Sequence, residues 1–513
     1  MRTRTRVLAA FSAALALCVT PPAFAQGVNS SAEQGERASE IDAYLRERTN
    51  ASGAPGVAYA VVTPESVEHI GTWGDTGNGQ PVTETTPFLW GSVAKPVTAT
   101  AVMTLAEDGA LDLDRPVRAY LPSFALADGA GDAITVRQLL DQTSGIPEGT
   151  GATDRFGERS DPYGEAVADL ADVAPLSPPG EKFEYSSANY LVLGAVVQAV
   201  SGRPFAEYLR DHVLDPLDMS GAITSPREAR AAQLPGGHSH AFGQPVGVPL
   251  RYDETGASYG YLGGTVEDLA HFAMAHLNEG RYGSARVLDP ASVATAHDGT
   301  ARISDTLRYG LGWRDDDRNA DLGTRMVWHT GAAPGYFAAV VLLPELNRGI
   351  VMTQNIYGFF QDSELVGTAL GAARILAGGQ PEPVSGDITY PLLLAVLLAV
   401  LAGAAAVLIW SLYRMFRPSN APRGPARILT AMACWVLGGL ALAHLAVVLL
   451  PRTAGADLRL VRLWAPDVGW LLVATAVAGP AVAAARLICG CRHLQRARAQ
   501  RLLAARRPAR TGP

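Results

Sequence analysis

The sequence has few lysines and few cysteines, and their scarcity narrows the class of protein. Lysine occurs only twice in 513 residues, as Lys95 and Lys182, and cysteine four times. Only 18% of the residues are charged and 48% are hydrophobic, which excludes a disordered chain and a nucleic-acid-coating protein. Cys18 lies in an N-terminal apolar run and the other three cysteines follow residue 430, so the long polar body between them cannot be held together by disulfides. That body must be stabilised by a hydrophobic core, for which its length is ample.

The net charge of -7 hides three segments of different sign. Residues 26–385 contain 24 basic and 46 acidic side chains, whereas residues 386–513 contain fifteen Arg and three Asp. The first six residues add three Arg. Because 513 residues also exceed one ordinary domain, we expect these segments to form separate parts in different surroundings.

The N-terminus has the three parts of a secretory signal. Three Arg in the first six residues precede an apolar run over 7–19, and residues 23–25 match a small-x-small cleavage site. The run has about thirteen residues, which is too short to cross a bilayer. We therefore expect a signal peptide at 1–25 that is cleaved before Gln26.

Three long apolar runs follow the polar body, at about 391–412, 428–450 and 468–489. Each approaches the ~20 residues that cross a bilayer. Four Arg lie between the first two runs and eight lie at or after the end of the third, most of them in an Arg-rich tail at 490–513. The positive-inside rule places both Arg-rich segments in the cytoplasm. We therefore expect three transmembrane helices joined to the body by a linker at 377–390, in a multi-pass protein of the cell membrane with an extracytoplasmic body.

Residues 26–376 combine strand-like and helix-like stretches. Runs rich in β-forming residues lie at 57–63, 336–343 and 350–354, and a turn signal separates the last two. Between the strands, apolar spacing predicts one helix after Ser92 and another at 188–200. Strands at both ends with helices between them predict an α+β domain whose terminal strands share one antiparallel sheet.

Two short motifs suggest nucleophilic chemistry. In Ser92-Val93-Ala94-Lys95, a serine at a helix start and a lysine three residues later lie on one helix face. The helix N-terminus favours developing negative charge, and a desolvated lysine can act as a base toward the serine hydroxyl. Tyr185 begins a second motif just before a predicted helix; a tyrosine beside a lysine can relay protons, because the cation favours its phenolate.

The third motif is His329-Thr330-Gly331-Ala332, which begins a stretch of small residues before a predicted strand. Small residues let a substrate lie along the strand edge, with a backbone N–H directed at an oxyanion. His238 and His240 are a weaker signal, because the preceding Gly-Gly indicates a loop, and we expect neither a metal site nor a cofactor.

In this order the three motifs resemble those of the serine β-lactamase and penicillin-binding protein family, in the branch of class C β-lactamases, DD-peptidases and related esterases. The resemblance extends from about residue 53 to residue 355. It implies a β-lactamase/DD-peptidase-like fold, with an antiparallel sheet flanked by helices and an all-helical region. It also implies that Ser92 is the nucleophile, that Lys95 and Tyr185 share acid and base work, and that the N–H groups of Ser92 and Ala332 form the oxyanion hole. The substrate would be bound by the remaining motif residues, Ser187, His329, Thr330 and Gly331.

Two motif positions depart from the family pattern. The second motif usually ends in Asn, which contacts the substrate amide, but Ser187 takes that place here and Asn189 is the alternative source of an amide. The third motif often begins with Lys, which helps to hold a substrate carboxylate, whereas His329 is largely neutral at pH 7. Both departures favour a general acyl hydrolase over an efficient β-lactamase.

These observations predict a membrane-anchored, exported serine hydrolase that acts through an acyl-enzyme on Ser92. Its substrate would be a D-amino-acid peptide or an ester. The alternatives are a β-lactamase and a non-catalytic penicillin-binding sensor of cell-wall fragments. The expected partners are a small-molecule or peptide substrate and the lipid bilayer, with no nucleic acid.

Overall fold

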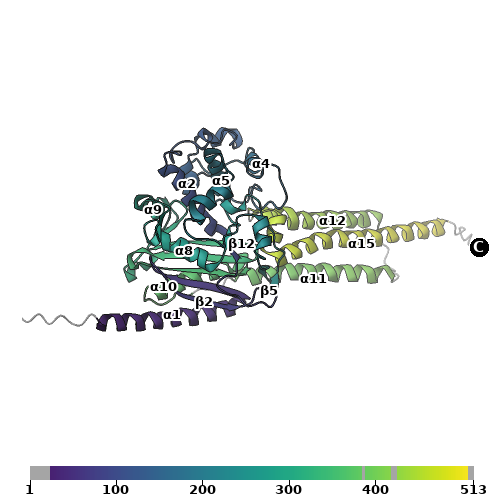
Figure 1. The fold of residues 1–513 in the computed structure, drawn as a ribbon. Helices are drawn as coiled ribbons and strands as arrows, with labels where there is room; N and C mark the ends of the chain where they lie inside the picture. The colour runs from purple at the N-terminus through teal and green to yellow at the C-terminus, as the bar shows by residue number, and fades with distance from the viewer. Residues whose placement is uncertain (1–23, 384–387, 417–423, 454, 506–513) are drawn as a thin grey trace, which may run out of the picture.

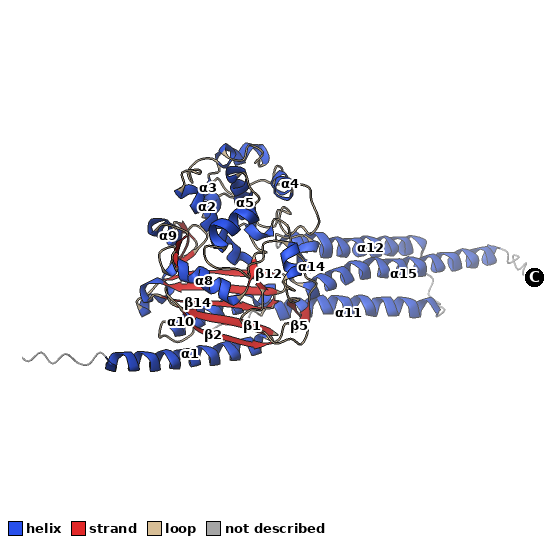
Figure 2. Cartoon of the chain, viewed as in Figure 1, coloured by secondary structure: helices blue, strands red, loops and turns tan. Residues whose placement is uncertain are grey.

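The computed structural model describes residues 24–383, 388–416, 424–453 and 455–505, and its body is built on an eight-stranded antiparallel sheet (Figures 1 and 2). The strand order is β2-β1-β14-β13-β12-β11-β10-β9. These strands are β1 (Gly56–Val62), β2 (Val67–Gly74), β9 (Ala301–Arg302), β10 (Leu307–Tyr309), β11 (Arg314–Asp316), β12 (Met326–Ala333), β13 (Tyr336–Leu343) and β14 (Arg348–Gln354). The shorter strands are β3 (Phe88–Leu89) paired with β6 (Gly263–Gly264), β7 (Arg281–Tyr282) paired with β8 (Ala285–Arg286), and the group of β4 (His238–Ala241), β5 (Gln244–Gly247) and β15 (Ile356–Tyr357).

The helices of the body lie before, between and after these strands. They are α1 (Phe24–Ser52), α2 (Ala94–Glu107), α3 (Val136–Leu140), α4 (Pro162–Ala168), α5 (Ser187–Ser201), α6 (Phe205–Leu209), α7 (Pro226–Ala231), α8 (Val266–Leu277), α9 (Pro290–His297) and α10 (Asp362–Leu376). The C-terminal part contains α11 (Thr389–Phe416), α12 (Pro425–His444), α13 (Leu450–Thr453), α14 (Leu458–Trp464) and α15 (Pro466–Ala505).

Strands from the two ends of the body are neighbours in the sheet, as the sequence predicts, and lie next to its β2 edge. β1 pairs antiparallel with β14, from Val57 opposite Gln354 to Val62 opposite Gly349. Every residue of β1 is buried, so the strand is covered on both faces. Such a strand must lie inside a sheet, where it can pair with a strand from a distant part of the chain. The predicted hairpin is also confirmed, since β13 and β14 pair along their whole length.

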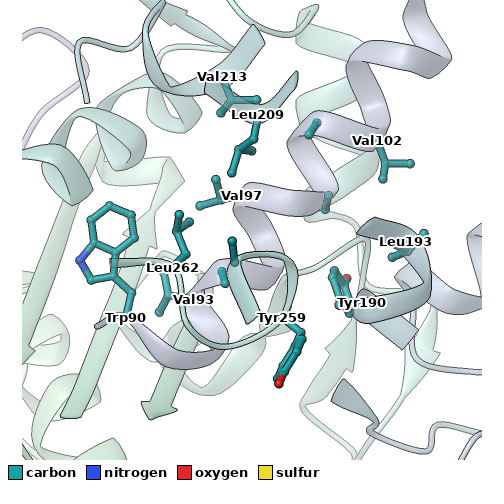
Figure 3. Packing of buried hydrophobic residues seen from close by; sticks show 14 of the residues in the cluster. Trp90, Val93, Val97, Val102, Tyr190, Leu193, Leu209, Val213, Tyr259 and Leu262 are labelled. Carbon is teal, nitrogen blue, oxygen red and sulfur yellow. The ribbon is translucent and has the colours of Figure 1, made fainter. Parts of the chain in front are cut away.

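The sheet is covered by helices on both faces, and alternate residues of each strand enter different cores. From β1, Ala58 and Ala60 join the larger core beneath α8, whereas Val57 and Tyr59 join the core beneath α1 and α10. The helical region packs on the larger core through α2 and α5. Figure 3 shows this packing, with Trp90 at one end, Tyr190 at the other and Val97 between them. The candidate nucleophile therefore lies where the sheet and the helical region share one core.

Three C-terminal helices are long and apolar enough to cross a membrane, at Thr389–Phe416, Pro425–Thr453 and Pro466–Ala499. They contain the three predicted apolar runs and project from one end of the body (Figure 1). One difference is that the predicted Arg-rich tail continues α15 as far as Ala505, because Arg, Ala, Leu and Gln are strong helix formers. Residues 1–23 and 384–387, which hold most of the predicted signal peptide and part of the predicted linker, lie outside the described residues.

Candidate active site

Ser92 lies in a short 3-10 turn, η1 (Gly91–Val93), that leads directly into α2. From Gly91 to Thr100 every residue is buried except Ser92, which is partly exposed. Lys95 is one turn further along the same face and is completely buried. The predicted pair is therefore brought together at a helix start, with the serine accessible and the lysine removed from water.

The side chain of Lys95 is surrounded by oxygen acceptors, and no carboxylate of the described residues is in hydrogen-bonding contact with it. Its Nζ donates to Ser92 Oγ at 2.9 Å, to Ser187 Oγ at 3.3 Å and to the carbonyl oxygen of Tyr259 at 2.8 Å. Burial lowers the pKa of Lys95 from 10.5 to about 7; the nearby charge of Glu148 opposes this shift. Lys95 is therefore neutral in a large fraction of molecules at neutral pH and can accept the Ser92 proton.

Tyr185 contacts the same two residues. Lys95 Nζ lies 4.9 Å from the centre of its ring, and Ser92 is close enough to the Tyr185 hydroxyl to lower the pKa of that group. Burial nevertheless raises the pKa of Tyr185 well above 10, and the charge of Arg314 and the proximity of Ser92 only partly offset this effect. The expectation that the lysine favours a tyrosine phenolate is therefore not met: Tyr185 is held as a neutral hydroxyl beside a lysine that can itself be neutral.

Two glycines bring the backbones of η1 and β12 together beside Ser92. A Cβ on Gly331 would collide with the carbonyl oxygen of Trp90 and lie 2.5 Å from the backbone N of Ser92. A Cβ on Gly91, whose φ is +54°, would collide with the backbone of Ala332. Only glycine permits this approach at both positions. The backbone N atoms of Ser92 and Ala332, predicted to form the oxyanion hole, therefore lie on two chain segments in direct contact.

The third motif occupies the end of β12, where the sheet leaves an edge open. β11 pairs with β12 only from Met326 to Trp328, so residues 329–333 have β13 on one side and η1 on the other. Thr330 and Ala332 are partly exposed, as predicted for a substrate-binding strand.

The ring of His329 is buried rather than presented to a substrate. Its Nδ1 lies 2.6 Å from the carbonyl oxygen of Thr330 and its Nε2 lies 2.9 Å from the hydroxyl of Tyr309. A carbonyl oxygen only accepts, so Nδ1 carries the proton and Nε2 accepts from Tyr309. Burial holds the pKa of His329 well below its usual value, so the ring is neutral. The centre of this ring lies 6.4 Å from that of Tyr185, so His329 borders the site as a buried, neutral group. Its contact with substrate stays a prediction.

The second motif positions Ser187 but not Asn189. The backbone N–H of Ser187 donates to Glu148 Oε2 at 2.5 Å, and its hydroxyl accepts from Lys95. Asn189 is fully buried: its Nδ2 donates to Gln142 Oε1 at 2.6 Å and its Oδ1 accepts from Ser144 at 2.6 Å. The amide of Asn189 therefore does not replace the missing Asn of the motif.

Arg314, on β11, supplies a cation that sequence reasoning missed. Its guanidinium carbon lies 5.7 Å from the ring centres of both Tyr185 and Tyr309 and 4.9 Å from that of Trp328. Among the described residues Arg314 forms no ion pair within 4 Å, although its charge acts on both Tyr185 and Asp362. The guanidinium can therefore still bind an anion beside Tyr185. The neutral His329 thus has a charged neighbour where the family pattern often has a lysine.

Glu148 and Tyr259 were also missed, because neither belongs to a motif. Glu148 lies in the loop after α3, and Tyr259 contributes only a carbonyl oxygen, which any residue type has. Gly236 and Gly237 lie in a loop, as predicted, and the two histidines that follow belong to strand β4. The part of the chain that the structure describes has no cluster of three potential metal ligands.

Comparisons with known proteins agree with this geometry. The Beta-lactamase family profile matches residues 41–373. Penicillin-binding protein 4 of Amycolatopsis lactamdurans is 32% identical over 351 residues, which are 64% of this chain and 90% of that protein. Protein flp of Staphylococcus aureus (strain MW2) is 25% identical over 321 residues, which are 62% of this chain and 63% of that protein.

Two solved structures have a similar fold. The octameric penicillin-binding protein homologue from Pyrococcus abyssi has a TM-score of 0.59 at 24% identity, over 70% of this chain and 81% of that one. The D-stereospecific amidohydrolase from Streptomyces sp. has a TM-score of 0.53 at 22% identity, over 64% of this chain and 98% of that one. At these identities the two structures show a common fold alone. Together with the family profile and the 32% identical relative, they show that the chain belongs to the Beta-lactamase family of serine hydrolases, with a domain of the penicillin-binding protein and DD-peptidase type.

Proposed function

We propose that this chain is a membrane-anchored serine hydrolase that forms an acyl-enzyme on Ser92. The observation that carries the proposal is the contact of 2.9 Å between Lys95 Nζ and Ser92 Oγ. The amine is fully buried and its pKa is lowered to about 7. A serine hydroxyl paired with a base of this pKa is an activated nucleophile.

The reaction follows from these contacts. Neutral Lys95 takes the hydroxyl proton of Ser92 while Oγ forms a bond to the substrate carbonyl carbon. The resulting oxyanion accepts from the backbone N–H groups of Ser92 and Ala332. As the bond to the leaving group breaks, the proton passes from Lys95 through the Tyr185 hydroxyl to the leaving amine or alcohol. Water then attacks the acyl carbon and gives a proton to Lys95. The bond between Ser92 Oγ and the acyl carbon breaks, and Lys95 returns this proton to Ser92 Oγ.

The charges at the site favour a substrate with a carboxylate. Arg314 places a cation beside Tyr185, in a chain whose third motif lacks the usual lysine. A D-amino-acid peptide has such a carboxylate, and one of the solved structures with a similar fold is a D-stereospecific amidohydrolase. We therefore rank two substrate classes equally, D-amino-acid peptides and esters. Both rank ahead of a β-lactam that is turned over efficiently, because the side chain of Ser187 is too short to replace the amide of the usual Asn.

The membrane assignment rests on three features of the sequence. The three C-terminal helices have mean hydropathies of 3.0, 2.2 and 1.9. Arg residues lie between the first two helices and after the third, and a signal peptide is predicted at the N-terminus. The hydropathies support membrane spanning, and the Arg distribution and the signal peptide support an extracytoplasmic catalytic domain.

The test is the intact mass of the full chain in detergent after incubation with benzylpenicillin, followed by mapping of any modified peptide. We expect the mass to rise by one penicilloyl group on the peptide that contains Ser92. Consumption of the antibiotic without an adduct would instead indicate a β-lactamase. An adduct on any other residue, or intact antibiotic together with no hydrolysis of esters or D-amino-acid peptides, would contradict the proposal.

The acylation rate should depend on pH through Lys95. Its pKa is lowered to about 7, so its neutral form disappears as the pH falls below that value. The pKa of Tyr185 is raised, so this hydroxyl stays protonated over the same range. We expect the second-order rate constant for benzylpenicillin to rise about tenfold per pH unit below pH 7 and to level off above it. A flat profile between pH 5 and 9 would rule out Lys95 as the titrating base.

A further inference from the structure

The segment between the second and third apolar helices folds back onto the catalytic domain. Its described part runs from Gly455 to the end of α14 at Trp464. In Figure 2, α14 lies between β12 and the apolar helices α12 and α15. A connecting loop of a membrane anchor has no need of contacts with a catalytic domain.

One end of the segment holds the loop that carries Glu148. Arg459 Nη1 donates to the backbone carbonyl of Asp154 at 2.9 Å. Gly149 lies directly against Gly455, since a Cβ on Gly149 would be 2.6 Å from the carbonyl oxygen of Gly455. The loop of residues 148–155 is thus clamped at both of its ends by the segment.

The clamped loop is connected to the catalytic lysine. The backbone N–H of Asp154 donates to the Tyr259 hydroxyl at 2.8 Å, and the carbonyl oxygen of Tyr259 accepts from Lys95. At the other end of the loop, Glu148 accepts from the backbone of Ser187, whose hydroxyl also accepts from Lys95. Both routes from the segment to Lys95 consist of direct contacts.

The other end of the segment contacts the opposite side of the site. The ring of Trp464 meets that of Tyr357 edge-on, with centres 5.6 Å apart. Trp464 packs on the same apolar cluster as Ala332 of the predicted oxyanion hole. Tyr357 is close enough to Tyr185 for the two hydroxyls to influence each other electrostatically. The segment therefore reaches both sides of the predicted catalytic group.

The segment is fixed in turn by the start of α15. Asp467 is completely buried and accepts from the backbone N–H of Phe242 at 2.8 Å and from the hydroxyl of Tyr390 at 2.5 Å. These bonds join the first turns of α15 and α11 to the β4–β5 hairpin of the catalytic domain. Phe360 stacks on Tyr390 at 5.1 Å and extends the same junction.

We propose that residues 455–464 are a structural part of the active site, and that Arg459 is a positioning residue that holds the 148–155 loop against Ser187 and Lys95. The catalytic meaning of this inference rests on the proposed function, but the docking does not. The apolar helices therefore have a second role besides anchoring, because they hold the segment that positions residues of the active site.

The test uses the full chain in detergent with three variants. Arg459→Ala removes the contact to Asp154, and Arg459→Lys keeps the charge. Arg462→Ala is the matched control, because Arg462 is on the same helix but its side chain packs along Gly469 of α15. We expect the backbone amides of residues 148–155 to exchange hydrogen about tenfold faster in Arg459→Ala than in the wild type, because the loop opens locally more often. In Arg462→Ala the exchange rate of these amides should be unchanged. The exchange rate of these amides in Arg459→Lys should lie between those of Arg459→Ala and Arg462→Ala.

A second measurement separates positioning from general loss of structure. The charged groups that act on Lys95 are Glu148 and Asp154, which raise its pKa, and Arg314, which lowers it; the rings of Tyr185 and Tyr190 lie beside it. Releasing the loop moves the carboxylates away, so the rising limb of the acylation profile should shift to lower pH in Arg459→Ala while the plateau falls about fivefold.

Hydrogen exchange does not depend on turnover, so it tests the docking even in a chain that benzylpenicillin does not acylate. Equal exchange of the 148–155 loop in Arg459→Ala and the wild type would overturn the inference. The same would follow if Arg462→Ala accelerated exchange as much as Arg459→Ala, because the effect would then belong to the helix as a whole. Faster exchange with an unshifted pH profile would overturn the positioning role of Arg459.

Discussion

Ser92→Ala is expected to abolish the benzylpenicillin adduct and to lower kcat/KM for any acyl substrate by about 10⁴-fold or more. The variant lacks the oxygen that lies 2.9 Å from Lys95 Nζ, and no other hydroxyl in the site combines this contact with a place beside the oxyanion-hole backbone. Lys95 keeps its bonds to Ser187 and to the carbonyl oxygen of Tyr259. Because Ser92 is partly exposed, its loss should leave the fold and the melting temperature nearly unchanged.

The measurement is intact mass together with ester hydrolysis and thermal unfolding of the same preparation. Ser284→Ala is a suitable control, because Ser284 is exposed in the turn between β7 and β8, far along the chain from the three motifs. The Ser284→Ala variant should be acylated on Ser92 to the same extent as the wild type. If Ser92→Ala hydrolysed esters at the wild-type rate, the acyl-enzyme on Ser92 would have to be abandoned.

The parts of the fold that the sequence predicts are those with a strong local signal. β13 and β14 are buried strands, apart from Arg348, and are joined by a turn of Pro344 to Asn347. Their apolar runs and the break between them are therefore visible in the chain. The same holds for α5, whose end at Ser201 is followed by Gly202 in the left-handed conformation. The candidate site could be predicted from the three motifs. In the first of them, the nucleophile and its base must lie at a fixed spacing on one helix.

The parts that could not be predicted depend on residues brought together by tertiary structure. Arg314 reaches Tyr185 because β11 lies beside β12, and a short strand with the sequence Arg-Asp-Asp has no apolar pattern that marks it. Glu148 reaches Ser187 across a loop whose course is fixed by packing. The helix α14 has seven residues between two apolar helices, and its sequence alone reads equally well as a plain connecting loop.

Burial explains how two predicted residues behave in the site. A lysine near a tyrosine favours the phenolate only when the hydroxyl is solvated, and desolvation dominates for Tyr185. The ring of His329 is buried beside Tyr309 although its neighbour Thr330 is partly exposed, because residues at alternate positions of a strand face opposite sides. Neither the degree of burial nor the side of the strand is encoded in a motif of three or four residues.

Lys95→Met is expected to lower kcat/KM for acylation by about 10³-fold and to stabilise the fold. Methionine fills the volume of the lysine stem but cannot accept the Ser92 proton. The pKa of Lys95 is about 7 in the folded chain and 10.5 when exposed. Between these values the unfolded chain binds more protons, so stability rises with pH there, and at pH 7 the buried lysine costs the folded state about 4 kcal/mol. Removing that cost should raise the melting temperature although the activity is lost.

Lys182 is the natural control for this prediction, because it is the other lysine of the chain. Its side chain is 54% exposed and pairs with Glu184 at 2.5 Å. Lys182→Met should therefore change neither the acylation rate nor the melting temperature measurably, since exposed ion pairs contribute little. If Lys95→Met kept acylation within about tenfold of the wild type, a hydroxyl such as Tyr185 would have to serve as the base. Loss of activity together with a lower melting temperature would show instead that Lys95 holds the site together through its three hydrogen bonds.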